Sequence, residues 1–290
     1  MTVIAMTVDD NKAMPGSPES SRGSEIGIGQ VFVRAGLPAL FTWVLLLPAY
    51  FLPAVDSTRA PYFDLTSEFA AVAYWVSGSG SKFGAPIVGV LVLLLLVTRT
   101  GLSGRQRWKE AVLVIVLAAV FAGGGAALNE HGVKEALKIP RPNIVWLAGD
   151  NGSGPLGMRA DEFYGLGDKA RRGASLLKVL EQSPSPVLLA PEIREHWVDE
   201  TGYSFPSGHS LSAMFFATFL LAMAVSYVTG RRAWLFYLLL PWALAVCYSR
   251  PILRVHTPTD IAVGGFEGIV VGTIAWFIAR SLLRKFAGNL

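Results

Sequence analysis

Long apolar stretches alternate with shorter polar segments along this chain of 290 residues. Six stretches contain about 15 to 21 residues each, at about 35–53, 83–98, 110–128, 209–229, 233–249 and 260–280. A helix needs about 20 residues to cross a hydrocarbon core of about 30 Å. The pattern therefore predicts an all-α, polytopic membrane protein built as a six-transmembrane-helix bundle. The second stretch is short, and the amphipathic segment 67–76 either extends it or lies along the membrane interface.

The polar segments suggest how the domain is organised. Residues 1–34 are interrupted by Pro15, Gly16, Pro18 and Gly23 and contain no apolar run near the start. They predict a disordered cytoplasmic tail followed by an uncleaved first span. Residues 35–285 then form one six-span domain. Within it, the segment 129–205 between spans three and four is expected to be helical and to lie on the outer side.

Composition supports a membrane location. Hydrophobic residues make up 52% of the chain and charged residues 16%, compared with roughly 25% charged residues in soluble domains. The net charge of +4 comes mainly from short loops between spans, so we expect no nucleic-acid partner. The single cysteine, Cys247, lies in span five and excludes a disulfide within the chain.

Positive charges in the short loops predict the orientation. Lysine and arginine are retained on the cytoplasmic side of membrane proteins. They cluster between spans two and three, between spans four and five, and after span six, at Arg99, Arg105, Arg107, Lys109, Arg231, Arg232, Arg280, Arg284 and Lys285. Both termini are then cytoplasmic, and the segments 129–205 and 250–257 face outward.

The sequence Pro206-Ser207-Gly208-His209 opens the fourth apolar stretch. Serine is a preferred N-cap, and the first backbone N–H groups of a helix favour a bound anion. Taken alone, the tetrapeptide fits a simple helix cap better than a binding site. With the other motifs, it predicts a phosphate site in which His209 protonates a leaving oxygen.

The sequence His256-Thr257-Pro258-Thr259-Asp260 opens the sixth stretch. Proline favours the first helical position, so Thr257 is the expected N-cap and Asp260 lies in the first turn. A carboxylate bonded to one ring nitrogen leaves the other nitrogen of His256 free to act as a nucleophile. Asp260 also complements the helix dipole, and the two roles are compatible.

Three further cations, Lys134, Arg141 and Arg250, lie where apolar stretches meet water. A single such residue is ordinarily a snorkelling side chain or a lipid headgroup contact, which we keep as the reading for Lys138. Three cations beside two histidines would repel one another without an anion between them. A phosphoryl group, with about −1.5 to −2 charge and three acceptor oxygens, would resolve this conflict.

The ordered pattern Lys-x6-Arg-Pro, Pro-Ser-Gly-His and Ser-Arg-x5-His-x3-Asp resembles the type 2 phosphatidic acid phosphatase superfamily. The resemblance implies that His256 forms a phosphohistidine, that Asp260 orients it and that His209 protonates the leaving group and then activates water. It also implies that phosphate is held by Lys134, Arg141, Ser207, Gly208 and Arg250. No metal or other cofactor is implied, and the four histidines, which include His131 and His196 in the outer segment, show no metal-ligand spacing.

A longer similarity runs from about residue 129 to the end of span six. It includes the stretches Arg141-Pro142-Asn143, Asp161-Glu162-Phe163-Tyr164 and Glu200-Thr201-Gly202-Tyr203, and it resembles the bacterial phosphatidylglycerophosphatase B family. The resemblance implies that this chain is an inner-membrane enzyme that acts on phosphatidylglycerol phosphate, and also on undecaprenyl pyrophosphate, phosphatidic acid and diacylglycerol pyrophosphate. The substrates are then a membrane lipid phosphate and its bilayer, with no obligate protein partner.

Other functions remain open from the sequence. A dedicated undecaprenyl pyrophosphate phosphatase or a lipid A phosphatase would use the same motifs. A lipid-phosphate transporter would use the cations but would not need an imidazole oriented by a carboxylate. An enzyme of the vanadium haloperoxidase type would share the pocket but is a soluble protein.

Glu267 departs from the expected family pattern because it lies about two turns into span six, where an ionisable group is costly. It neighbours Gly264, Gly268 and Gly272, a ridge of small residues that would allow another helix to approach closely. A carboxyl bonded at a helix contact is favoured over a role in substrate gating.

Overall fold

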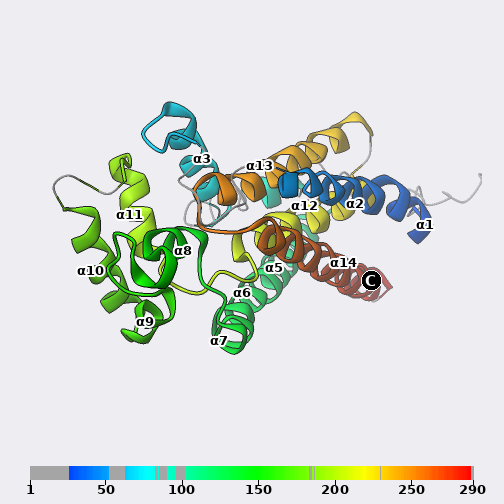
Figure 1. Cartoon of the computed structure of the whole chain (residues 1–290). Coiled ribbons are helices and arrows are strands. Elements are labelled where there is room, and N and C mark those ends of the chain that lie inside the picture. The colour runs from blue at the N-terminus through cyan, green and yellow to red at the C-terminus, as the bar shows by residue number, and fades with distance from the viewer. Residues whose placement is uncertain are drawn as a thin grey trace, which may run out of the picture.

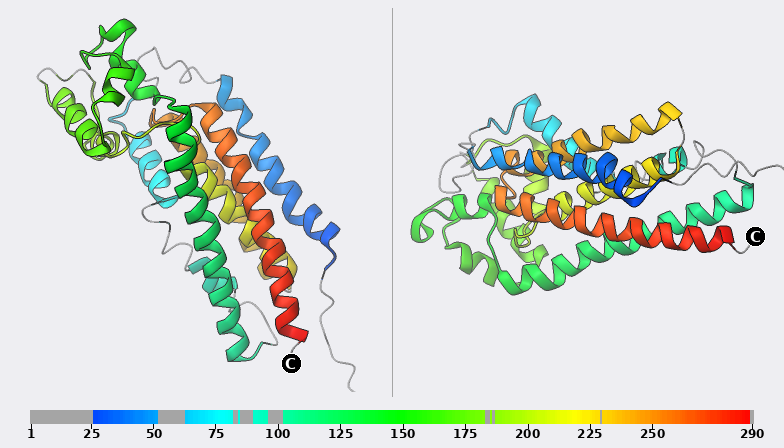
Figure 2. Two further views of the ribbon diagram at one scale, coloured as in Figure 1. Left: turned by 90° about the horizontal axis from the view of Figure 1, so that it is seen from below. Right: turned by 90° about the vertical axis from the view of Figure 1, so that its right-hand side faces the viewer.

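A computed structural model describes residues 26–51, 63–81, 84, 90–95, 102–182, 185, 187–228 and 230–288. All regular secondary structure in these residues is helical. Helices α12, α13 and α14 and the first apolar helix lie side by side as a bundle, and α8 to α11 gather at one end of it (Figures 1 and 2). The C-terminus lies at the opposite end.

Five helices in the described part of the chain are long and apolar enough to cross a membrane: Ile28–Phe51, Gly104–Ala148, Gly208–Tyr227, Arg231–Ile252 and Pro258–Lys285. The first comprises α1 (Ile28–Val31), a π-helical turn (Phe32–Gly36), α2 (Leu37–Val44) and a 3-10 turn (Leu47–Phe51). The last three correspond to α12 (Gly208–Tyr227), a 3-10 segment (Gly230–Leu238) with α13 (Leu239–Ile252), and α14 (Pro258–Gly288).

The second of these, Gly104–Ala148, is unbroken only through Leu137, and we call the part Gly104–Leu137 the rod. It comprises α5 (Gly104–Ala118), a π turn (Ala119–Gly123), α6 (Gly124–Leu128), a second π turn (Asn129–Val133) and α7 (Lys134–Leu137). The segment between the rod and α12 keeps the name outer segment from its expected position. It comprises α8 (Pro142–Ala148), a 3-10 turn (Asp150–Gly152), α9 (Ala160–Gly165), α10 (Lys169–Leu180) and α11 (Pro191–Asp199).

The expected spans differ from these helices in three places. The second expected span, 83–98, lies largely outside the described residues, of which Gly84 and 90–95 are helical. The first apolar helix begins at Ile28 rather than at 35, because its first turns tolerate polar residues at their exposed positions. The third begins at Gly104, after the capping box at Ser103, and continues to Leu137 rather than covering 110–128, because ion pairs such as that of Glu130 with Lys134 keep its polar residues within the helix.

The segment 67–76 belongs to α3 (Glu68–Ser79), which begins at the N-cap Ser67. This helix packs against α13 and also against α11 of the outer segment. The buried hydroxyl of Ser77 faces the Arg250 guanidinium. Helix α3 therefore forms one wall between the bundle and the outer segment.

Glycines allow α12 and α14 to form the most extensive helix pair of the bundle. A Cβ on Gly264 would lie 2.3 Å from the Ser207 carbonyl oxygen, and one on Gly268 would lie 2.4 Å from the Leu211 carbonyl oxygen. Only glycine permits so close an approach of two backbones. The expected glycine ridge is therefore a helix contact, and it places the start of α14 against the start of α12.

Glu267 lies beside this ridge and accepts a hydrogen bond from the Asn129 side-chain amide at 2.8 Å. Asn129 is buried and belongs to the rod. The favoured interpretation of Glu267 as a carboxyl bonded at a helix contact is confirmed, and the contact joins α14 to the rod.

The outer segment has an apolar core of its own. Phe163, Leu176, Ile193 and Trp197 are fully buried in it. The Trp197 indole donates a hydrogen bond of 2.8 Å to the Leu253 carbonyl oxygen, in the turn that precedes His256. The outer segment thereby supports the turn between α13 and α14.

Candidate active site

The turn before α14 has the geometry that its sequence predicts. The Thr257 hydroxyl accepts a hydrogen bond from the Asp260 backbone N–H at 3.2 Å, and Asp260 Oδ2 accepts one from the Thr257 backbone N–H at 2.8 Å. These reciprocal bonds form a capping box. The same carboxylate oxygen lies 3.2 Å from Nδ1 of His256, so one side chain closes the helix and orients the imidazole.

The start of α12 lies next to this turn. Ser207 is the N-cap, and its hydroxyl accepts a hydrogen bond from the Ser210 backbone N–H at 3.3 Å. Its own backbone N–H donates to the Asp260 carbonyl oxygen at 3.0 Å, which fixes α12 against α14. Ser207 is fully buried, whereas Gly208 and His209 are partly exposed.

The first motif turns at the end of the rod. Lys138 adopts a left-handed conformation at φ 51°, which ends α7, and Pro142 occupies the first turn of α8. Arg141 is the N-cap residue of α8, and its backbone N–H donates to the Tyr164 hydroxyl at 3.0 Å. Its side chain is buried, with Nε donating to the Gly202 carbonyl oxygen at 2.8 Å.

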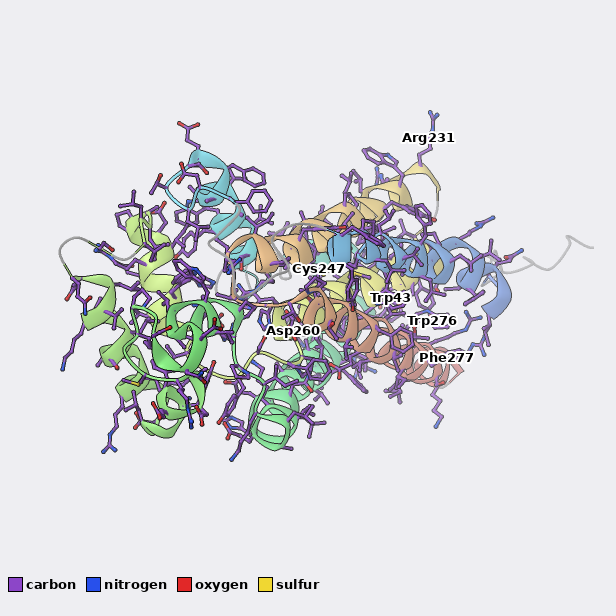
Figure 3. The ribbon with its side chains drawn as sticks, in the orientation of Figure 1. Trp43, Arg231, Cys247, Asp260, Trp276 and Phe277 are labelled. Carbon is purple, nitrogen blue, oxygen red and sulfur yellow. The ribbon has the colours of Figure 1, made fainter. Side chains whose placement is uncertain are left out.

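These elements surround a cavity of about 420 Å³. The rod contributes Lys134, the turn after it Arg141, α12 both Gly208 and His209, and the turn before α14 His256. Three further predicted residues lie behind the lining: Ser207 caps α12, Asp260 supports His256, and Arg250 reaches the lining residues Glu200 and His196. Figure 3 shows Asp260 at the end of the bundle next to the outer segment, and Arg231 at the far end.

His256 is held on both sides of its ring. Nδ1 faces Asp260, while Nε2 lies 3.3 Å from Nη1 of Arg141. Asp260 also receives a bond from the Ser204 hydroxyl, which lies 3.5 Å from Nδ1 of His256. This network assigns the ring proton to Nδ1 and leaves the Nε2 lone pair directed toward the cavity cations. The arrangement suits a nucleophilic imidazole.

The charge state of His256 agrees with that role. Burial lowers the pKa of His256 to about 3; the positive charge of Arg141 acts in the same direction and Asp260 opposes it. The ring is therefore neutral at physiological pH, and a neutral ring has the lone pair that a nucleophile needs.

A carboxylate bridges the two buried arginines. Oε2 of Glu200 lies 2.6 Å from Nη2 of Arg141, and Oε1 lies 3.2 Å from Nη2 of Arg250. Burial alone would raise the pKa of Glu200, but Arg141 and Arg250 hold it well below its usual range. We call these three residues the inner clamp. Nη1 of Arg250 also lies 3.2 Å from Nε2 of His196.

A second carboxylate bridges two lysines in the same cavity. Glu130 contacts the Lys134 ammonium at 2.8 Å through Oε2 and the Lys169 ammonium through Oε1. Glu130 and Lys134 belong to the rod, whereas Lys169 is the first residue of α10. We call these three residues the outer clamp.

The cavity also contains residues that the motifs did not assign: Ser77, Glu130, Lys169, His196 and Glu200. His196 was expected in an outer loop, but it lies on α11 and is buried against Arg250. Within the described residues, no group of three His, Cys, Asp or Glu side chains could hold a metal ion. One signal for Glu200 was available in the sequence, because three clustered cations require a counter-charge.

Comparison with known proteins shows which family has these motifs. Residues 108–283 match the PAP2 superfamily, and this region contains all three motifs. This chain belongs to the PAP2 superfamily. It is 32% identical to phosphatidylglycerophosphatase B of Escherichia coli K12 over 212 residues, which cover 72% of this chain and 76% of the relative. Identity to phosphatidylglycerophosphatase B of Haemophilus influenzae is 27% over 257 residues, or 86% of this chain and 94% of that protein.

A shorter similarity extends to a different phosphatase. The lipid A 4'-phosphatase of Bacteroides thetaiotaomicron is 32% identical over 88 residues, which cover 30% of this chain and 36% of that protein. Membership of PAP2, homology to phosphatidylglycerophosphatase B and the apolar helices together support a multi-pass membrane lipid phosphatase.

Proposed function

We propose that this PAP2 protein hydrolyses phosphatidylglycerol phosphate to phosphatidylglycerol and phosphate, and also accepts undecaprenyl pyrophosphate and phosphatidic acid. The observation that carries the mechanism is the His256 ring, bonded to Asp260 at Nδ1 and directed by Nε2 toward Arg141 in the cavity. The homology to phosphatidylglycerophosphatase B supports the choice of lipid.

In the first proposed step, Nε2 of His256 attacks phosphorus while the bond from phosphorus to the leaving oxygen breaks. His209, which lines the same cavity, donates a proton to that oxygen, and the lipid product leaves. Asp260 stabilises the positive charge that develops on the His256 ring.

In the second step, His209 accepts a proton from water, and the water oxygen attacks the phosphohistidine. The bond from phosphorus to Nε2 breaks, and inorganic phosphate leaves with His256 neutral again. Lys134, Arg141, Arg250 and the Gly208 backbone N–H hold the equatorial oxygens, and Ser207 fixes the start of α12.

In the inner clamp, the Glu200 carboxylate offsets the positive charges of the two buried arginines. Glu200 supplies the anion between Arg141 and Arg250 that a phosphoryl group would supply in the complex. Because a phosphoryl group has more charge and more acceptor oxygens than a carboxylate, it can compete for the same guanidinium groups.

We further propose a location in the bacterial inner membrane with six spans, cytoplasmic termini and a cavity facing the outer side. Arg231, in the short loop between spans four and five, lies at the end of the bundle away from Asp260 (Figure 3), and positive loop residues favour the cytoplasmic side. A pyrophosphate lipid carrier released on the outer side would then reach the cavity without crossing the bilayer.

The test is phosphate release by the purified protein in detergent, with and without EDTA. The substrates are phosphatidylglycerol phosphate, undecaprenyl pyrophosphate, phosphatidic acid and lipid A. We expect release from the first three, with EDTA changing the rates little. Activity on lipid A alone would favour a second candidate function, that of a lipid A phosphatase, which the similarity to the lipid A 4'-phosphatase supports. Loss of activity in EDTA with rescue by magnesium would refute the cation mechanism.

A further inference from the structure

Two carboxylates in this cavity are each held between two cations, and the pairs lie next to each other. The inner clamp surrounds Glu200 beside His256, and the outer clamp surrounds Glu130. The proposed mechanism uses one phosphoryl group, which accounts for the inner clamp and for Lys134. It gives no role to Lys169 or Glu130.

Gly202 lies beside both clamps. Its carbonyl oxygen accepts a bond from Arg141 in the inner clamp. On its other side, an added Cβ would lie 2.9 Å from Cε of Lys169 and 3.3 Å from Oε1 of Glu130 in the outer clamp. One residue therefore contacts both clamps, and an anion in each would be adjacent.

Exposure increases across the outer clamp, from Lys134 to Lys169. The Lys134 side chain is 8% exposed, that of Glu130 is 28% exposed and that of Lys169 is 53% exposed. An exposed ion pair contributes little to stability, in the range of about 0 to 1 kcal/mol. A phosphate with about −1.5 to −2 charge can therefore displace Glu130 from Lys169 at small cost.

We propose that the outer clamp is the binding subsite for the second phosphate group of a lipid that has two, and that Lys169 determines how strongly the protein distinguishes such lipids from lipids with one phosphate group. This inference rests on the proposed function, because it assumes that a phosphoryl group is cleaved beside His256. Lys169 binds the second group, which takes the place of the Glu130 carboxylate. Pyrophosphate lipids and phosphatidylglycerol phosphate belong to this substrate class, whereas phosphatidic acid does not.

The test compares diacylglycerol pyrophosphate with phosphatidic acid of the same acyl chains, because the two differ by one phosphate group. We measure kcat/KM from initial phosphate release for the unmodified protein and for Lys169→Met. The variant should lower the ratio of the two values roughly five- to tenfold, as expected for one lost charge-assisted hydrogen bond at a half-exposed position. Lys169→Arg should recover most of the ratio.

Lys178→Met is the matched control, because Lys178 is an exposed lysine on the same helix that does not line the cavity. It should keep the ratio of the unmodified protein. If Lys169→Met leaves the ratio unchanged, or lowers kcat/KM equally for both lipids, the inference of a second subsite is wrong while the proposed function stands. Absence of phosphate release from both lipids by the unmodified protein would overturn the proposed function, and the inference with it.

Discussion

Replacing Gly264 by alanine should separate the two halves of the candidate active site. The added Cβ would lie 2.3 Å from the Ser207 carbonyl oxygen, a backbone atom that cannot rotate away. The Ser207 N–H bond to the Asp260 carbonyl oxygen crosses the same helix contact. The substitution therefore pushes the turn bearing His256 away from the helix start bearing His209.

The structure sets the size of this displacement. Real Cβ contacts are essentially never shorter than 3.0 Å, so the helices must part by at least 0.7 Å, the difference between 3.0 Å and 2.3 Å. A misplacement of about 1 Å in a catalytic constellation can cost about a hundredfold in rate. We expect a loss of kcat on that order. The free energy of unfolding should change less than the activation free energy. Overpacking costs about 1–3 kcal/mol, and the higher helix propensity of alanine offsets about 1 kcal/mol of this cost.

Gly265→Ala is the matched control, because its Cβ would meet only side-chain atoms, the nearest being Cδ1 of Leu46 at 3.2 Å. Phosphate release and thermal unfolding in detergent are measured for both variants and for the unmodified protein. Gly264→Ala should lose activity while unfolding at a temperature near that of Gly265→Ala. If the two variants retain kcat values less than about tenfold apart, the helix contact does not position the site and the reasoning is wrong.

Three further predictions follow from the site and the loop charges. Asp260→Asn should reduce kcat by about a hundredfold or more, because the amide permits the wrong ring tautomer; activity near that of the unmodified protein would remove the orienting role. Since the pKa of His256 is lowered to about 3, its ring should stay neutral from about pH 8 to pH 5 in nitrogen-15 spectra, and a transition near the ordinary value of about 6.5 would contradict the buried network. In a Cys247→Ala background, an impermeant thiol reagent added to spheroplasts should label a cysteine at Ser153 and spare one at Ser103, and the reverse pattern would place the cavity on the cytoplasmic side.

Local motifs predicted the parts of the site that depend on helix starts. The caps at Ser207 and Thr257 follow from residue types at fixed spacing, so the sequence was sufficient to place Asp260 beside His256. The five candidate phosphate and imidazole residues on the cavity wall were likewise predicted from motif order. We inferred that these residues lie close together because all of them were expected at span ends on the same side of the membrane.

Contacts between distant elements were not predictable in the same way. Glu200 bridges two arginines that are 109 residues apart in the chain, and only the docking of α11 brings it there. Lys169, the first residue of α10, pairs with Glu130 of the rod although the two are 39 residues apart in the chain. The rod itself was predicted too short, since its polar residues interrupt the apolar pattern although the helix continues and pairs them with neighbours.

The most direct test of the central claim is to trap the covalent intermediate on His256. A lipid or ester substrate with a good leaving group and a radioactive phosphate is mixed with the His209→Ala protein, and the reaction is stopped in alkali, in which phosphohistidine survives. The account predicts acid-labile label on the peptide that contains His256, and no label in a protein that also has His256→Ala. Label retained after His256→Ala, or found on another residue, would contradict the account.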